Sequence, residues 1–67
     1  MANSIIHVLC REILRAFREG NFTFSAFGKL FGIEHVNGAE YRIVTSENSD
    51  IGLRFMNERG NLRFFMA

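Results

Sequence analysis

The N-terminal third of the chain alternates apolar and polar residues with the period of a helix. Apolar residues recur at steps of three and four positions, as on the buried side of an amphipathic helix. These residues are Ile6, Leu9, Cys10, Ile13, Ala16 and Phe17. Gly20 follows them and suits the left-handed residue that ends many helices. The pattern predicts a first helix over about 4–19.

The next segment predicts a second, shorter helix. Thr23 can cap its N-terminus, and Phe22 can pack against Phe27 as a hydrophobic staple. The positions expected to face inward are Phe24, Phe27, Leu30 and Phe31, and Gly32 ends the segment. Gly28 lies inside this helix and costs about 1 kcal/mol relative to Ala.

Asn37 and Gly38 predict a tight hairpin turn. Both central residues of a type I′ turn need a positive φ, and Asn-Gly tolerates this best. The turn joins a strand over 33–36 to a strand over 39–45. This pairing sets His35 opposite Glu40.

The last seventeen residues predict a second hairpin. A strand over 51–57 and a strand over 62–67 flank a polar turn over 58–61. Alternation pairs Leu53 with Met66 and Phe55 with Phe64 on one apolar face. The opposite face then carries Arg54, Met56, Arg63 and Phe65, with Arg59 at the tip of the turn.

Together these elements predict an α+β fold with a single small domain over 1–67. Two N-terminal helices pack on one face of a three- or four-stranded antiparallel sheet, in the order α-α-β-β-β. A domain of 67 residues buries only about 60% of the surface that its unfolded chain exposes. Because 48% of the residues are hydrophobic, we expect an apolar contact surface on the outside, with a homodimer as one use of it.

Charge and composition exclude several classes of protein. The formal net charge is +1 and the pI about 8.0, so no overall field attracts the protein to nucleic acid or to a membrane. Charged residues from Arg11 onward interrupt the apolar run 5–10 before it could span a bilayer. The single cysteine, Cys10, rules out an internal disulfide and fits a reducing compartment. We therefore expect a soluble, cytoplasmic protein.

The residues indicate no enzyme. His7 and His35 fall on separate elements, and no Cys, His or carboxylate spacing suggests a metal site. No glycine-rich phosphate loop is present. Cys10 lies on an apolar helix face, where burial raises the pKa of a thiol and makes it a poor nucleophile. We expect no catalysis, no cofactor and no metal.

Two surfaces are the candidate binding sites. Arg11, Arg15 and Arg18 share one side of the first helix with His7, within roughly 80° of arc. The outer face of the final hairpin adds Arg54, Met56, Arg59, Arg63 and Phe65. Arginine and aromatic side chains together suit a protein interface or stacking on unpaired bases.

The leading hypothesis is a small binding protein that blocks or regulates another macromolecule, a protein in the first place, by occupying its surface. A short domain with no visible site is typical of inhibitors encoded by phages or mobile elements, including antagonists of host defence proteins. That expectation comes from the class of protein and from no residue of the chain. The alternative is a nucleic-acid-binding regulator that uses the arginines of the first helix and of the final hairpin.

A DNA-binding helix-turn-helix is a special case of this alternative. The segment 27–33 places a small residue four positions before a glycine, as the first half of that motif does. Its recognition helix would have to run through Asn37 and Gly38, which favour a hairpin instead.

Overall fold

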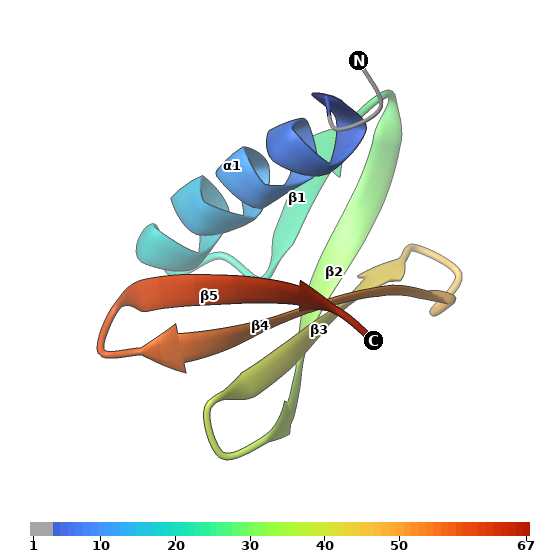
Figure 1. Ribbon diagram of the computed structural model, residues 1–67. Coiled ribbons are helices and arrows are strands. Elements are labelled where there is room, and N and C mark those ends of the chain that lie inside the picture. The colour runs from blue at the N-terminus through green and yellow to red at the C-terminus, as the bar shows by residue number, and fades with distance from the viewer. Residues whose placement is uncertain (1–3) are drawn as a thin grey trace.

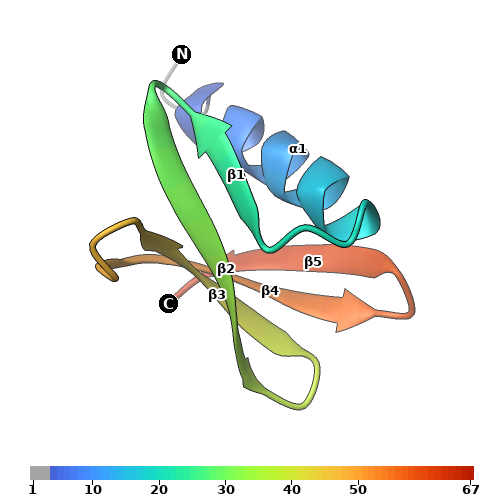
Figure 2. The ribbon, with the colours of Figure 1, turned by 180° about the vertical axis from the view of Figure 1, so that it is seen from behind.

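The computed structural model describes residues 4–67 and folds them into one helix and five strands (Figure 1). In chain order these are α1 (Ser4–Arg18), β1 (Thr23–Ala26), β2 (Lys29–Asn37), β3 (Glu40–Thr45), β4 (Asp50–Glu58) and β5 (Asn61–Met66). Each strand pairs antiparallel with the next, so the sheet order is β1-β2-β3-β4-β5. The predicted fold class is therefore wrong, because a single helix packs on a curled sheet of five strands (Figures 1 and 2).

The first helix matches its prediction closely. It ends at Arg18, and Gly20 takes a positive φ of 78°. The N–H of Asn21 donates to the carbonyl of Ala16 at 2.9 Å, which is the hydrogen bond that characterises this kind of helix C-terminus.

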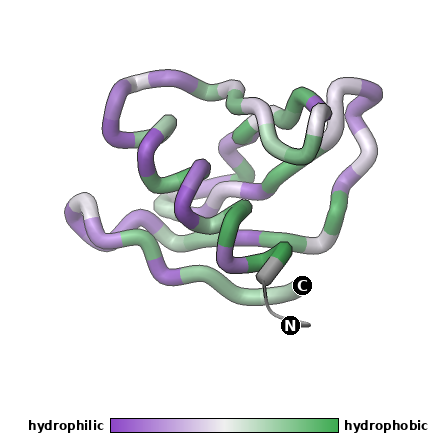
Figure 3. Tube along the Cα trace, turned by 90° about the horizontal axis from the view of Figure 1, so that it is seen from above, coloured by the Kyte–Doolittle hydropathy of each residue, from purple (hydrophilic) through white to green (hydrophobic). Residues whose placement is uncertain are grey.

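The core lies between α1 and the concave inner face of the sheet. The helix contributes Leu9, Ile13 and Ala16. The sheet contributes Phe24, Phe31, Ile33, Ile43, Leu53 and Phe55. Ile13, Ile43 and Phe55 have no exposed surface. Hydrophobic and hydrophilic residues are interspersed along the helix and the strands (Figure 3), and in each of these elements only part of the residues is buried.

The predicted second helix is instead the hairpin of β1 and β2. Phe24 is buried while Thr23 and Ser25 are exposed, which is the period of a strand. Phe27 and Gly28 both have a positive φ, 54° and 71°, and two successive residues of this kind close a type I′ turn and not a helix. Aromatic and β-branched residues favour strands and glycine disfavours helices, so local preference agrees with the observed structure.

Only half of the inward positions assigned to that helix are buried. Phe24 and Phe31 face each other across the two strands, with stacked rings 5.2 Å apart. Phe27 and Leu30 are about half exposed, at 55% and 50%. Gly32 lies within β2, where Val44 of β3 comes so close that a Cβ on the glycine would stand 3.2 Å from its methyl group. Here the glycine makes room for a cross-strand neighbour.

The turn between β2 and β3 lies one residue later than predicted. Asn37 pairs with Glu40, so the central residues are Gly38 and Ala39, and only Gly38 has a positive φ. Glycine at the first central position is typical of type II′ turns. The register shifts before Asn37 and sets His35 opposite Tyr41.

The predicted pairing of His35 with Glu40 is therefore wrong. The later turn alone would set His35 opposite Arg42, and a β-bulge that adds one residue to β2 near Val36 brings it opposite Tyr41. The imidazole of His35 instead donates from Nε2 to the carbonyl of Gly38, 2.7 Å away.

The final hairpin forms in the predicted register. Leu53 faces Met66 and Phe55 faces Phe64, with the turn over 58–61. Strict alternation fixes this register because a slip by one residue would turn the whole apolar set outward. The arrangement places α1 on the concave side of the sheet, closest to β1, and within residues 4–67 no helix packs on the convex outer face (Figures 1 and 2).

Candidate protein-binding surface

Two rows of side chains cross the outer face of the sheet. Partners directly opposite each other in a sheet share a face, so one row runs from β2 to β5. It contains Glu34, Arg42, Arg54 and Phe65. The second row runs from β3 to β5 and contains Glu40, Met56 and Arg63. The predicted hairpin residues Arg54, Met56, Arg63 and Phe65 thus lie together on one surface.

Two guanidiniums stand directly opposite each other in the middle of this surface. Like charges in such a position repel, and three carboxylates offset the repulsion between Arg42 and Arg54. Arg42 donates to Glu34 from Nε at 2.9 Å. Arg54 donates two hydrogen bonds of 2.9 Å to Asp50, from Nη1 to Oδ1 and from Nη2 to Oδ2. Its Nε lies 3.6 Å from Oε2 of Glu40. We call these five residues, Glu34, Glu40, Arg42, Asp50 and Arg54, the ion-pair cluster.

A bulge in β4 brings Asp50 into the cluster. Arg42 of β3 pairs with Arg54 of β4, and Val44 of β3 pairs with Asp50 of β4. One residue of β3 separates these pairs but three residues of β4 do, so β4 carries two extra residues there. Asp50 accepts a hydrogen bond from the N–H of Gly52 at 2.8 Å, besides its two bonds from Arg54. The Arg54 guanidinium and then this N–H lower the pKa of Asp50 to about 2, so the carboxylate is charged at any ordinary pH.

Toward β5 this surface carries an aromatic ring, a methionine side chain and a third guanidinium. Phe65 stands opposite Arg54 and is 36% exposed, and Met56 stands opposite Arg63 and is half-buried. Arg63 donates to Glu58 from Nη2 at 2.8 Å and from Nε at 3.1 Å. This hydrogen bond lowers the pKa of the Glu58 carboxyl. The guanidiniums of Arg54 and Arg63 thus already have carboxylate partners within the chain.

The basic strip of the first helix forms a separate surface. Arg11, Arg15 and Arg18 are all exposed on the side of α1 that faces away from the sheet. Arg15 forms an ion pair with Glu12, and within residues 4–67 no ion pair joins Arg11 or Arg18 to a carboxylate. Because the sheet lies between this strip and the convex face, the two predicted sets of arginines do not form one continuous site.

The carboxylates that accompany the arginines were not among the predicted site residues. Asp50 and Arg54 are four residues apart on one strand, so alternation places them on the same face, and the bulge between them brings Asp50 to Arg54. Glu34 was missed because the predicted turn at Asn37 and Gly38 sets it opposite Tyr41, whereas the later turn and the bulge together set it opposite Arg42. Arg59 lies where it was predicted, exposed at the tip of the last turn with a φ of 58°.

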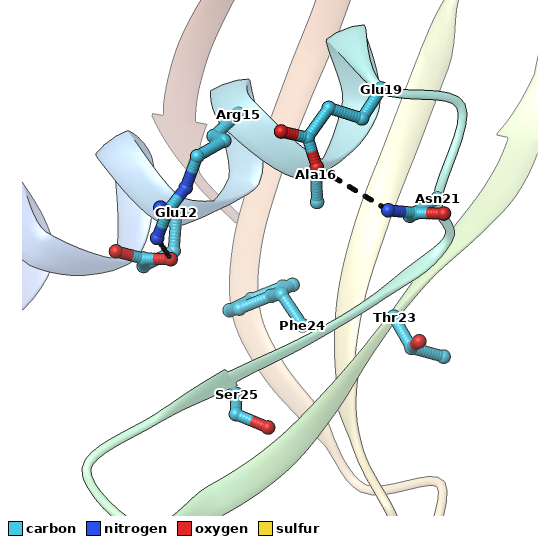
Figure 4. Close-up of a pocket in the computed structure, with 8 residues that line it drawn as sticks. All are labelled: Glu12, Arg15, Ala16, Glu19, Asn21, Thr23, Phe24 and Ser25. Atoms are coloured by element: carbon cyan, nitrogen blue, oxygen red, sulfur yellow. Dashed lines mark hydrogen bonds and ion pairs between the residues drawn. The ribbon is translucent and has the colours of Figure 1, made fainter.

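The hollows of the molecule offer little for chemistry. One hollow of about 290 Å³ lies between α1 and β1 (Figure 4). Its charged groups already have partners, because Glu12 binds Arg15 and Glu19 accepts from Asn21 at 3.5 Å. In the part of the chain that the structure describes, no three His, Cys, Asp or Glu side chains gather as metal ligands, and no helix has the length and hydropathy to cross a membrane.

Comparison of the chain with models of protein families, with curated proteins and with solved structures found no match in any of the three. The surface itself is therefore the feature of the molecule that bears on function. That surface is a convex sheet face with the ion-pair cluster of three carboxylates and two guanidiniums at its centre and the ring of Phe65 on β5 at its edge.

Proposed function

We propose that the protein is a non-enzymatic binding protein that blocks or regulates another protein by occupying its surface. The observation that carries the proposal is that Arg54 and Arg63 are already bound to carboxylates of the chain. Arg54 is held by Asp50 and Arg63 by Glu58, while Phe65 and Met56 lie between them. Aromatic residues, methionine and arginine are the residue types that protein interfaces favour, and here the guanidiniums of Arg54 and Arg63 keep their own carboxylate partners.

The balance of charge favours a protein over a nucleic acid at this face. The ion-pair cluster holds three carboxylates against two guanidiniums. A phosphate approaching Arg54 would have to displace Asp50, whose carboxylate already accepts hydrogen bonds from both terminal nitrogens of the guanidinium. A protein partner can instead cover Phe65 and leave the ion pairs in place. Since the chain is small, we expect the effect on its partner to be steric blockade.

The second candidate function is nucleic-acid binding through α1. The exposed strip of Arg11, Arg15 and Arg18 supports it, since guanidiniums on one helix face can contact successive phosphates. Such binding would weaken steeply with salt because bound counterions are released. A protein interface that is anchored by Phe65 should weaken only mildly.

The test is recovery of partners from a lysate of the source cell by the immobilised protein, with and without nuclease and at low and high salt. We expect a defined protein to stay bound after nuclease and high salt. Phe65→Ala should abolish its recovery, and Phe27→Ala is the matched control because Phe27 is also an exposed phenylalanine on a hairpin, at 55%. The Arg11/Arg15/Arg18→Ala triple variant should retain the partner.

The opposite result would contradict the proposal. If only nucleic acid is recovered, and the triple variant loses it while Phe65→Ala keeps it, then the helix strip is the functional surface. Circular dichroism of each variant checks that the loss of a partner does not reflect loss of the fold.

A further inference from the structure

The two edges of the sheet differ in how well they are protected. β1 has four residues, and α1 packs closest to this strand. β5 has six residues and pairs with β4 on one side only. Exposed strand edges offer unpaired main-chain groups to other strands unless they are short, covered or charged. By this criterion the free edge of β1 is protected, whereas the free edge of β5 is available for pairing with another strand.

The main-chain groups of β5 point alternately toward β4 and away from it. Such alternation is a property of antiparallel pairs. The N–H of Ala67 donates to the carbonyl of Gly52 at 2.8 Å, so the odd-numbered residues of this segment point toward β4. Leu62, Phe64 and Met66 consequently direct their N–H and carbonyl groups outward. Within residues 4–67 these groups make no hydrogen bond to a turn, a loop or the helix.

Exposed apolar side chains gather beside this edge. Met66 is 60% exposed and Phe65 36%. Ile6 on the first turns of α1 is 37% exposed. Ile6, His7, Cys10 and Met66 line an open hollow of about 480 Å³ between the N-terminal part of α1 and the end of β5. The open edge is therefore also a place where covering apolar surface would be favourable.

We propose that β5 pairs antiparallel with β5 of a second copy of the chain, about a two-fold axis at Phe64. This inference does not depend on the proposed function. A two-fold axis between antiparallel strands runs perpendicular to the sheet, so inner residues must meet inner residues and outer must meet outer. The allowed registers are then centred on Arg63, Phe64 or Phe65.

The side chains of β5 select among these registers. Arg63 is the only charged residue of the strand, and a register centred on it would oppose two guanidiniums. A register centred on Phe65 lies at the end of β5, so within Asn61–Met66 only Phe64 and Met66 pair their outward groups. The register centred on Phe64 pairs all three outward residues and places Leu62 opposite Met66 of the second copy. It also places Arg63 opposite Phe65 of the second copy, where the guanidinium can lie on the ring.

The experiment is sedimentation equilibrium of the whole chain from low micromolar to millimolar concentration. We expect a reversible monomer–dimer equilibrium. Met66→Lys introduces a charge at the edge and should raise the dissociation constant by about tenfold or more. Leu30→Lys is the matched control, because Leu30 is comparably exposed, at 50%, but lies on β2 between two strands. It should leave the dissociation constant unchanged.

Disulfide formation tests the register. In a Cys10→Ser background, we mix a protein carrying Arg63→Cys with one carrying Phe65→Cys. Positions 63 and 65 of two copies would form a closely spaced pair that suits a disulfide. We expect the mixed disulfide to form much faster than either homodimeric disulfide.

Three results would overturn self-pairing. They are a wild-type chain that stays monomeric at all concentrations, a Met66→Lys variant that dimerises as well as wild type while keeping the wild-type circular dichroism, and a mixed disulfide that forms no faster than the others. A monomeric chain that loses a foreign protein partner on Met66→Lys would assign the edge to a strand of that partner instead.

Discussion

The hairpin of β1 and β2 and the hairpin of β4 and β5 share a turn geometry and differ in what surrounds it. Phe27 and Gly28 have φ values of 54° and 71°, and Arg59 and Gly60 have 58° and 91°. In both hairpins the two central residues of the turn are left-handed, as in type I′ turns, whose twist matches that of the strands.

The flanking strands make the difference. β4 and β5 pair over six residues of each strand, include the fully buried Phe55 and carry the ion pair of Glu58 with Arg63. β1 and β2 pair over four residues of each strand, and among the described residues no ion pair joins them. The same turn can thus close a hairpin at the centre of the core or one at its margin.

The largest expected effect is the loss of stability on truncating a buried phenylalanine, which should be greater in the β4–β5 hairpin than in the β1–β2 hairpin. Phe55 packs against Phe17, Tyr41 and Phe64 with ring centroids 5.0–5.6 Å apart, whereas Phe24 stacks on Phe31 alone. Truncation of a buried phenylalanine to alanine costs about 3–5 kcal/mol. We expect Phe55→Ala at the upper end of this range and Phe24→Ala at the lower end, by urea unfolding.

A small domain has little stability to lose, so Phe55→Ala is expected to be unfolded without denaturant. Phe55→Leu and Phe24→Leu then give the graded comparison. If the change at Phe24 costs more than the change at Phe55, the β1–β2 hairpin is not marginal to the core.

The next effect tests the shared turn. Gly28→Ala and Gly60→Ala should each cost about 1–2 kcal/mol, because an L-residue with a positive φ brings its Cβ too close to the backbone. No neighbouring atom lies within 4 Å of the added Cβ in either turn, so backbone strain is the only cost and the two losses should be similar. D-alanine at either position, introduced by chemical synthesis, should restore the stability. A loss that D-alanine does not restore would show that the turn geometry is not the cause.

The two hairpins were also unequal in how well the sequence predicted them. In β4 and β5, period-two alternation runs without interruption through Leu53 and Phe55 and again through Phe64 and Met66, and no helical spacing competes with it. In residues 22–32 the apolar positions fit a period of three to four as well as a period of two. A phenylalanine in the left-handed conformation at position 27 is also an unusual turn residue, so the turn carried no clear sequence signal.

The bulges explain the remaining errors. The extra residues near Val36 and Gly52 shift the cross-strand partners of β2, β3 and β4. Alternation within one strand correctly grouped Arg54 with Met56 on the outer face. It could not bring Glu34 to Arg42, because that contact depends on a register that local preference does not encode.

A smaller effect in the opposite direction is expected from relieving the left-handed residues. Asn-Gly is the favoured pair in type I′ turns, so Phe27→Asn and Arg59→Asn should each raise the free energy of unfolding by about 0.5–1 kcal/mol. Phe27→Leu is the control, since leucine is apolar but tolerates a positive φ poorly. Thermal unfolding measures all three. A destabilising Phe27→Asn would mean that the ring of Phe27 makes contacts that outweigh the strain.

The smallest effect is on stability at acid pH. It concerns the Asp50 carboxyl of β4, which has no counterpart in β1. The pKa of Asp50 is lowered in the folded protein to about 2, first by Arg54 and then by the N–H of Gly52. A lowered pKa means that the native state holds the charged form, so this stabilisation is complete above the ordinary pKa of about 4 and disappears as the pH falls toward 2. Arg54→Gln should raise the pKa of Asp50, as followed by NMR of its carboxyl carbon, yet leave it below the ordinary value because Gly52 still donates. A pKa that does not move in Arg54→Gln would show that the main-chain N–H, and not the guanidinium, holds Asp50 in the ion-pair cluster.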